Sequence, residues 1–490
     1  MNWNKKVEEL LNKLNENASV EVYWQLTQAY RNKSELNSAE EIAQKGLNLF
    51  PTNPVLISEW AWNAQVKKDY KESSKRLEQL IKILEPNISE KIYTRLLDSY
   101  RYLGQFDKIE TLTQEALKKY PNSVKIKSFL EKSKEENLPK DVEIIVLTTF
   151  PKHASNNVGD QLITYSFLKL LEKRIPNLKY HIEFRANNLD KYLNSNIKYI
   201  LAPGFSIVNE VYPKIYGLFS DLNNLPKFFP LGCSFQHISP SLEVFQNNIY
   251  FEDSKKIFHK LLEKMNHPFL CRDILIKDML VKNGIDSVYS GDLAIYDEDY
   301  LNKEFNPPKN INSIVFTIGH HEKYEYQSYC LLTLIKYKFP DAKLYVSYHS
   351  KIHPRSKKIG NFAVSLGYEE VFMFGDVNNL EFYNDIDLHI GYRLHGHISF
   401  LRRRKPSILL VEDARSYGFA NTIGTHIGCF NALNADETIN NFAPIDAIKF
   451  VENEIKNEFK SYSEIFSFID KTFNNTLLPI IDQLVLELQN

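Results

Sequence analysis

The sequence predicts an α/β protein in which an N-terminal array of α-helical repeats is followed by two parallel-sheet domains. Three observations predict this fold class. Proline recurs at a fixed spacing in the first quarter of the chain, and short apolar runs alternate with helical patterns in the rest. The 490 residues, of which 43% are hydrophobic, are also too many for a single core and ample for several packed domains.

The repeats are marked by Pro51, Pro86 and Pro121, which lie 35 residues apart and each close an amphipathic run. Apolar residues recur nine residues before each proline, at Ile42, Leu77 and Leu112. Helical hairpins of this period resemble tetratricopeptide repeats, whose usual period is about 34 residues. We expect a helical-repeat domain over residues 1–135, serving either as a structural cap or dimerisation module or as a concave surface for a partner protein.

The two α/β domains are expected after a polar linker, 133–139. Apolar runs suited to buried strands then alternate with helical patterns, which is typical of parallel βαβ units. The runs are 143–148, 198–202, 228–232 and 268–271 in a first series, and 313–317, 343–347, 370–374, 388–391 and 407–411 in a second. With a hinge at 306–312, we expect domains at 141–305 and 306–434, a ligand cleft between them, and a helical tail at 435–490.

Composition excludes several classes of protein. A net charge of −1 argues against a nucleic-acid binder, which usually carries a basic face. The four cysteines lie far apart, which fits a reducing compartment and neither a disulfide framework nor a zinc ribbon. No signal-type leader and no apolar run of about 18 to 20 residues is present. We therefore expect a cytoplasmic protein without an integral membrane segment; attachment to the inner face of the cell membrane stays open.

Charged and titratable side chains follow two strands of the second series. Arg393 and His395 come just after strand 388–391, and Asp413 and Arg415 follow strand 407–411. Side chains at the carboxyl ends of adjacent parallel strands line the ligand crevice of such sheets. The sequence therefore predicts the chemistry at this edge. The cationic run 402–405 is expected to complement a helix C-terminus and to face solvent.

Five segments, in order, resemble the polysaccharide pyruvyl transferase family over residues about 141–434. They are 157–163, 231–235, 271–273 with 291–294, 393–395, and Asp413 through Gly418 and Phe419 to Gly424. The resemblance implies an enzyme that transfers pyruvate from phosphoenolpyruvate onto a sugar, usually as a ketal bridging two hydroxyls. The acceptor would be a cell-surface polysaccharide or its lipid-linked precursor. Such chemistry requires no metal or redox cofactor in principle.

The donor and its reaction set clear demands on the site. A phosphate and a carboxylate need cations and backbone donors, the methylene carbon needs an acid, and the sugar hydroxyl needs a base. By resemblance, Arg393 is the expected phosphate or carboxylate ligand, and His395 is the acid or a hydrogen-bond donor to the phosphate. Asp160, just after Gly159 where a helix begins, is the expected base or a ligand of the sugar hydroxyl. Purely structural roles are the alternatives: an ion pair of Arg393 with Asp387 or Asp413, a packing role for His395, and a helix N-cap role for Asp160.

Further residues are expected to bind substrate: Arg272, His320, His321, His349, Asp413 and Arg415. Arg272 directly follows a strand, and an ion pair with Asp273 is an equal alternative. The three histidines also follow predicted strands, and no ligand spacing among them supports a metal site.

Together these expectations describe two Rossmann-like domains in a GT-B-like arrangement, preceded by the repeats. The main alternative is a glycosyltransferase that binds a nucleotide-sugar donor in the same cleft, with Arg393, His395 and Arg415 on the diphosphate. Fold alone cannot separate the two activities. A third alternative is an inactive scaffold in which only the repeats have a function, and the cluster of Arg and His argues against it.

Overall fold

The computed structural model describes residues 3–103, 105–129, 142–151, 155–208, 210–247, 252–265, 267–422 and 427–489. The chain forms two compact units, the first made of Met1–Lys140 with Asn187–Ser195 and the second of Asp141–Ala186 with Asn196–Asn490. The predicted linker at 133–139 and the motif residue Gly424 lie outside the described residues.

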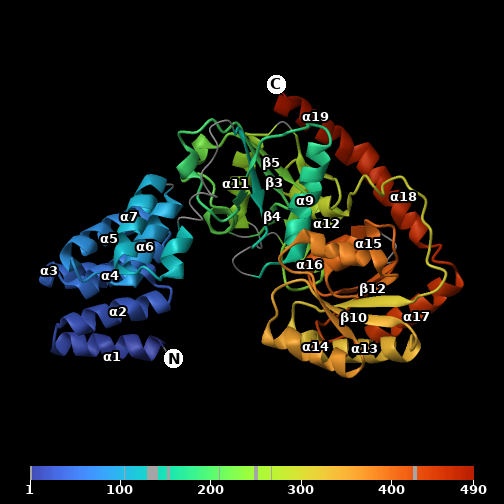
Figure 1. Cartoon of the computed structure of the whole chain (residues 1–490), viewed down its shortest axis with the longest axis horizontal. Coiled ribbons are helices and arrows are strands. Elements are labelled where there is room, and N and C mark those ends of the chain that lie inside the picture. The colour runs from blue at the N-terminus through green and yellow to red at the C-terminus, as the bar shows by residue number, and fades with distance from the viewer. Residues whose placement is uncertain are drawn as a thin grey trace. The chain divides into compact units, whose positions relative to one another are not determined.

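The first unit is a series of helical hairpins (Figure 1). Its helices are α1 Trp3–Glu16, α2 Val20–Asn32, α3 Leu36–Leu49, α4 Pro54–Val66, α5 Tyr70–Leu84, α6 Glu90–Tyr102 and α7 Phe106–Lys119. Helices α3, α5 and α7 each end two residues before one of the recurring prolines, so proline closes the second helix of each hairpin. The prediction of helical repeats is confirmed, and their assignment as tetratricopeptide repeats stays a prediction.

A short segment from later in the chain also belongs to this unit. Residues Asn187–Ser195 follow the second strand of the other unit and contain the 3-10 turn Asp190–Tyr192. Leu189 and Tyr192 are buried, and Asn187, Asn188 and Lys191 share a crevice with Arg101 and Tyr102 of the repeats. The periodicity of the sequence does not predict that this segment packs with the helical repeats.

The second unit begins with a parallel sheet in the order β2-β1-β3-β5. Its strands are β1 Ile144–Thr148, β2 His181–Phe184, β3 Tyr199–Pro203 and β5 Lys227–Leu231. The short parallel pairs β4 Ser206–Ile207 with β6 Ser234–Phe235, and β7 Phe269–Cys271 with β8 Ser287–Tyr289, accompany it. The helices are α9 Val158–Glu172, α10 Leu242–Gln246, α11 Glu252–Leu262 and α12 Ile274–Lys282. The strand order reverses at β1, so a crevice opens at the carboxyl ends of β1 and β3.

The second sheet is parallel throughout, in the order β11-β10-β9-β12-β13-β14. Counted from β9, this is the Rossmann order 3-2-1-4-5-6, whose switch point lies between β9 and β12. The strands are β9 Ser313–Thr317, β10 Lys343–Tyr348, β11 Glu369–Phe372, β12 Leu388–Gly391, β13 Ser407–Val411 and β14 Cys429–Asn431. The helices are α13 Glu325–Lys338, α14 Pro354–Ser365, α15 Leu394–Leu401 and α16 Ala414–Thr422.

Alternate residues of β9 show why this sheet is covered on both faces. Ile314 and Phe316 pack with the core under α13 and α14, while Val315 packs with the core that holds α15. Figure 1 shows α13 and α14 on one face of the sheet and α15 on the other. The predicted α/β fold class, with two Rossmann-like domains after a helical array, is confirmed.

The C-terminal tail runs across both sheets of the second unit (Figure 1). It consists of α17 Ala443–Lys456, α18 Tyr462–Thr472 and α19 Leu478–Gln489. Helix α17 contributes Ile448 and Val451 to the core of the second sheet. Helix α19 contributes Ile481 and Leu484 to the core that also contains Phe167 of α9. The last residues therefore complete the core beside the first sheet.

Candidate functional site

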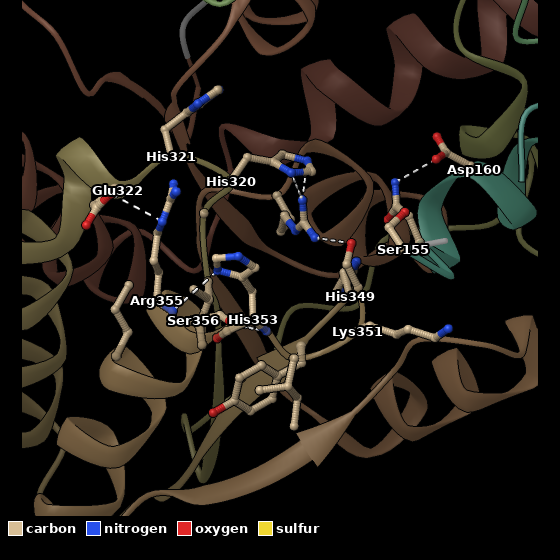
Figure 2. A pocket seen from close by; sticks show the side chains of 18 of the residues that line it. Ser155, Asp160, His320, His321, Glu322, His349, Lys351, His353, Arg355 and Ser356 are labelled. Carbon is tan, nitrogen blue, oxygen red and sulfur yellow. Dashed lines mark hydrogen bonds and ion pairs between the residues drawn. The ribbon is translucent and has the colours of Figure 1, made fainter. Parts of the chain in front are cut away.

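A cavity of about 580 Å³ lies where the carboxyl ends of the two sheets face each other. Ser155, Asp160 and Arg185 come from the first sheet's side, and Gln236 follows β6. The opposite wall is formed by the segments that follow β9 and β10, residues 318–322 and 348–356. Figure 2 shows Asp160 and Ser155 across from His320, His321 and His353. The switch point of the second sheet thus opens onto the cavity, as the rule for doubly wound sheets requires.

Arg393 follows β12 and is only 7% exposed. Its Nη2 donates to Ser350 Oγ at 2.6 Å, its Nη1 contacts the ring of His320, and its Nε has no partner among the described residues. Burial lowers the pKa of Arg393 to about 10. Asp387 instead accepts hydrogen bonds from the main chain of Asn312 and Ser313 at the start of β9. The alternative that Arg393 pairs with Asp387 is therefore wrong.

His395 lies in the first turn of α15, which begins at Leu394. Its Nε2 lies 3.6 Å from Asp292 Oδ2 and has no hydrogen-bond partner among the described residues. Arg272 approaches the same carboxylate, with Nη1 at 3.4 Å from Asp292 Oδ2. Burial opposes the ionisation of Asp292, but His395 and Arg272 hold its pKa below the ordinary value.

Arg272 is 4% exposed, and its Nε and Nη2 have no partner among the described residues. Its contact with Asp273 is 4.0 Å, longer than the one with Asp292. Burial raises the pKa of Asp273 to about 7 although Arg272 acts in the opposite direction. The alternative ion pair of Arg272 with Asp273 is therefore present, in a cluster in which Asp292 is the nearer carboxylate.

Asp160 lies in the first turn of α9, whose N-cap is Asn157. Asn157 Oδ1 accepts from Gly159 N at 3.3 Å, and Asn157 Nδ2 donates to Asp160 Oδ2 at 2.9 Å. The alternative that Asp160 is itself the N-cap is therefore wrong. Asp160 is held by Asn157 at the edge of the cavity (Figure 2), and its second carboxylate oxygen makes no hydrogen bond to the described residues.

Gly159 explains why the first motif needs glycine. A Cβ at this position would lie 2.5 Å from His395 Nδ1 and 2.7 Å from its Cβ, so the imidazole rests directly on the helix backbone. Gly418 has the same relation to Asp273, whose carboxyl carbon would lie 2.6 Å from an added Cβ. Both motif glycines therefore allow a side chain of the charged cluster to approach.

We expect Gly159→Ala to lower activity about 10- to 100-fold, because the added methyl must displace His395 by a sizeable fraction of an ångström. In a His395→Ala background the same substitution should have little further effect, since the ring it strikes is gone. Turnover of the four proteins in this double-mutant cycle tests the contact. Equal losses in both backgrounds would mean that Gly159 acts through helix α9 alone.

The three predicted histidines differ in their surroundings. His320 stands in the cavity wall, its main-chain N–H bound to Glu412, and the surrounding protein and the charge of Arg393 lower its pKa well below the ordinary value. His349 is buried, with Nε2 2.7 Å from Tyr383 Oη, and burial lowers its pKa in the same way. His321 is half-buried, and its pKa is also lowered by burial. All three reach the cavity as neutral rings rather than as cations.

Asp413 and Arg415 form one unit at the end of β13. Arg415 Nε and Nη2 donate to Asp413 Oδ2 at 2.8 and 2.5 Å, while Asp413 Oδ1 accepts from Ser416 N at 2.9 Å. Asp413 thus holds Arg415 and starts helix α16, and Arg415 faces the cavity. Both carboxylate oxygens of Asp413 are thus engaged by Arg415 and Ser416. Among the described residues, Arg393 makes no ion pair with Asp413, contrary to that alternative.

Comparison with known proteins agrees with this geometry. The sequence model of the family described as polysaccharide pyruvyl transferase matches residues 157–413, which run from the N-cap of α9 to the end of β13. The chain belongs to this family. The match contains every site residue discussed above except Ser155, which lies just before it, and Arg415, Ser416 and Gly418, which lie just beyond its end. No curated protein matches the sequence of this chain.

Solved structures that resemble this chain share little sequence with it. A Thermobaculum terrenum O-GlcNAc transferase mutant is 11% identical, with a TM-score of 0.32, and the match covers 100% of this chain and 99% of that one. UDP-GlcNAc 2-epimerase from Neisseria meningitidis is 9% identical, with a TM-score of 0.40 and coverage of 69% and 99%. A putative UDP-N-acetylglucosamine 2-epimerase from Listeria monocytogenes is 10% identical, with a TM-score of 0.40 and coverage of 70% and 96%.

The structure adds candidate site residues that the sequence reasoning missed. Glu412 follows β13 directly, Ser350 follows β10, and Arg185 follows β2. The rule that strand ends line the crevice could have found all three, since each lies within three residues of a strand's carboxyl end. Asp292 also lies three residues after the end of β8 and within the motif segment 291–294, but its approach to His395 depends on the packing of the two domains.

Among the described residues, no helix of the pyruvyl transferase combines the length and the apolar character needed to cross a membrane.

Proposed function

We propose that this pyruvyl transferase moves pyruvate from phosphoenolpyruvate onto a sugar of a cell-surface polysaccharide or of its precursor, forming a ketal. One observation carries the proposal: buried cationic or titratable side chains beside the cavity have nitrogen atoms without a hydrogen-bond partner among the described residues. They are Nε of Arg393, which lines the cavity, Nε2 of His395, which lines the adjoining crevice, and Nε and Nη2 of Arg272, which approaches the same Asp292 carboxylate as His395. Unused donors on buried side chains are costly, and an anionic ligand that accepts from them would remove this cost.

The proposed reaction balances without a further reactant. The methylene carbon of phosphoenolpyruvate takes one proton and becomes a methyl group, and two sugar hydroxyls add to the adjacent carbon and lose their protons. The C–O bond to phosphate breaks, and inorganic phosphate leaves with the remaining proton. The products are the pyruvate ketal and phosphate.

The residues have roles that suit these steps. Arg393 and Arg272 would hold the donor's phosphate and carboxylate, and His395 between them would supply the proton or a hydrogen bond to the leaving phosphate. Asp160, oriented by Asn157, would accept the proton of the attacking hydroxyl. The neutral rings of His320 and His321 would donate hydrogen bonds to the sugar or the phosphate.

The size of the cavity supports a second substrate. Its volume of about 580 Å³ is far more than phosphoenolpyruvate fills, which leaves the outer part for a sugar.

We further propose a cytoplasmic location, with contact to the membrane surface when the acceptor is lipid-linked, and a partner protein for the helical repeats. These proposals rest on the donor and acceptor classes named above. They set the conditions under which the activity should be sought.

Phosphoenolpyruvate should raise the Tm of the wild type by a few degrees at a concentration of about 100 Kd, because a ligand specific to the folded state stabilises it by about 2.7 kcal/mol. The shift should vanish in Arg393→Ala and persist in Arg174→Ala, a matched arginine that pairs with Glu298 outside the cavity. A thermal-shift titration with phosphoenolpyruvate and a panel of nucleotide sugars is the measurement. A shift with a nucleotide sugar and none with phosphoenolpyruvate would establish the glycosyltransferase alternative instead.

A further inference from the structure

Glu412 is a buried acid at the floor of the site that the proposed steps do not use. It follows β13, is 2% exposed, and lines a narrow crevice together with Arg393 and His395. Its carboxyl oxygens accept from the main-chain N–H of His320 at 2.9 and 3.2 Å. A Cβ on Gly319 would lie 2.8 Å from Glu412 Oε2, so the chain between β9 and His320 passes directly over the carboxyl group.

The charged and titratable groups around Glu412 come from every element packed against it. They are Arg393 after β12, Asp413 and Arg415 at the start of α16, the ring of His320 after β9, and the phenols of Tyr324 and Tyr392. Burial and the charge of Asp413 raise the pKa of Glu412 to about 8, although Arg393 and the His320 N–H favour the ionised form. The lowered pKa of His320 and the raised pKa values of both phenols keep those three groups neutral near pH 7.

We propose that Glu412 is a positioning residue that sets donor affinity through its proton. While the Glu412 carboxyl is protonated, it accepts the main-chain N–H of His320 and carries no charge, so the positive charge of Arg393 is free to bind the donor. Once ionised, it competes with the donor for Arg393. The inference rests on the proposed function in taking phosphoenolpyruvate as the donor.

The sign of the pH dependence follows from the geometry. A multiply charged anion on Arg393 adds negative charge beside Glu412 and disfavours its ionisation, so binding must take up a proton wherever Glu412 is partly ionised in the free enzyme. Donor affinity should therefore fall as pH rises through about 8. With the carboxyl protonated in the complex, the dissociation constant rises roughly tenfold between pH 7.5 and 9.

The test compares the wild type with Glu412→Gln, which keeps the acceptor for His320 and removes the titration. Calorimetry with phosphoenolpyruvate is run from pH 7.5 to 9, where the phosphate monoester is already fully ionised because its second pKa is about 6. The dissociation constant should rise roughly tenfold in the wild type and stay within about twofold in the variant. Asp273, with a pKa of about 7, is mostly ionised over this range and contributes equally to both proteins.

A second measurement needs no variant. Calorimetry of the wild type at pH 8 in buffers of different ionisation enthalpy should show uptake of about half a proton per bound donor. A pH-independent dissociation constant, an equal pH dependence in Glu412→Gln, or no proton uptake would each overturn the role of Glu412. Sulfate, which stays fully ionised, separates the two proposals. If sulfate shows the pH dependence and phosphoenolpyruvate does not bind, the proposed donor is wrong and the inference about Glu412 stands.

Discussion

Arg393→Ala should lower pyruvyl transfer by about 100- to 1,000-fold while leaving the fold intact. Removal of one preorganised donor to a developing or bound anion has costs of this size. The unfolding free energy should stay equal or rise, since burial of this guanidinium is unfavourable, as the lowering of its pKa to about 10 indicates. Turnover measured as phosphate release, together with denaturant unfolding, tests both parts.

Arg393→Lys provides the matched control of charge. It keeps one positive charge but cannot reach both Ser350 and the ring of His320 with a planar fork, so we expect intermediate activity. If Arg393→Ala instead lost activity and folded structure together, Arg393 would have to be assigned to the core of the second sheet.

Arg402→Ala should destabilise the protein by about 3 to 5 kcal/mol, the cost of breaking a buried ion pair from one side. Arg402 Nη2 donates to Asp297 Oδ2 at 2.7 Å, and Nη1 donates to Ser166 Oγ and to the carbonyl of Ala294. The guanidinium at the end of α15 therefore joins the two α/β domains. Denaturant unfolding of the purified variant measures the loss.

Arg403→Ala is the control. Arg403 follows Arg402 at the same helix end and donates hydrogen bonds to Asn384 and to two main-chain carbonyls, but it makes no ion pair with the described residues. We expect it to cost less than half as much unfolding free energy as Arg402→Ala, and similar losses would contradict the ion-pair account.

Acid titration gives a second check. Burial opposes ionisation of Asp297, but Arg402 and Lys169 lower its pKa to about 2. The wild type should therefore lose stability as pH falls from about 4 to about 2, and Arg402→Ala should lose less.

Much of this arrangement could be predicted from the sequence because it depends on local pattern. The recurring prolines set the ends of α3, α5 and α7, and the apolar runs became strands β9, β10, β12 and β13 at nearly the predicted bounds. Arg393 and Arg415 were found because a strand's carboxyl end has a fixed relation to its sheet. Their roles in catalysis, like those of Asp160 and His395, stay predictions.

The remainder depends on contacts between residues far apart in the chain, which local pattern does not record. The cationic run 402–405 was expected to face solvent, yet Arg402 and Arg404 are buried against Asp297 and Asp470. Their partners lie more than 60 residues away along the chain, so nothing near the run indicates that its charge is neutralised. Likewise, the alternative that Asp160 is the N-cap of α9 followed from its residue type, whereas Asn157 three residues earlier takes that place.

The position of the tail has a consequence for how the protein is made. Ribosomes release a chain from its N-terminus onward, and domains usually fold as they emerge. Here Phe167 in α9 shares its core with Ile481 and Leu484 of α19. The core beside the first sheet therefore stays incomplete until α19 has been synthesised. During that interval its apolar surface is accessible to chaperones, and a nascent chain that stalls before α19 would be exposed to aggregation and proteolysis.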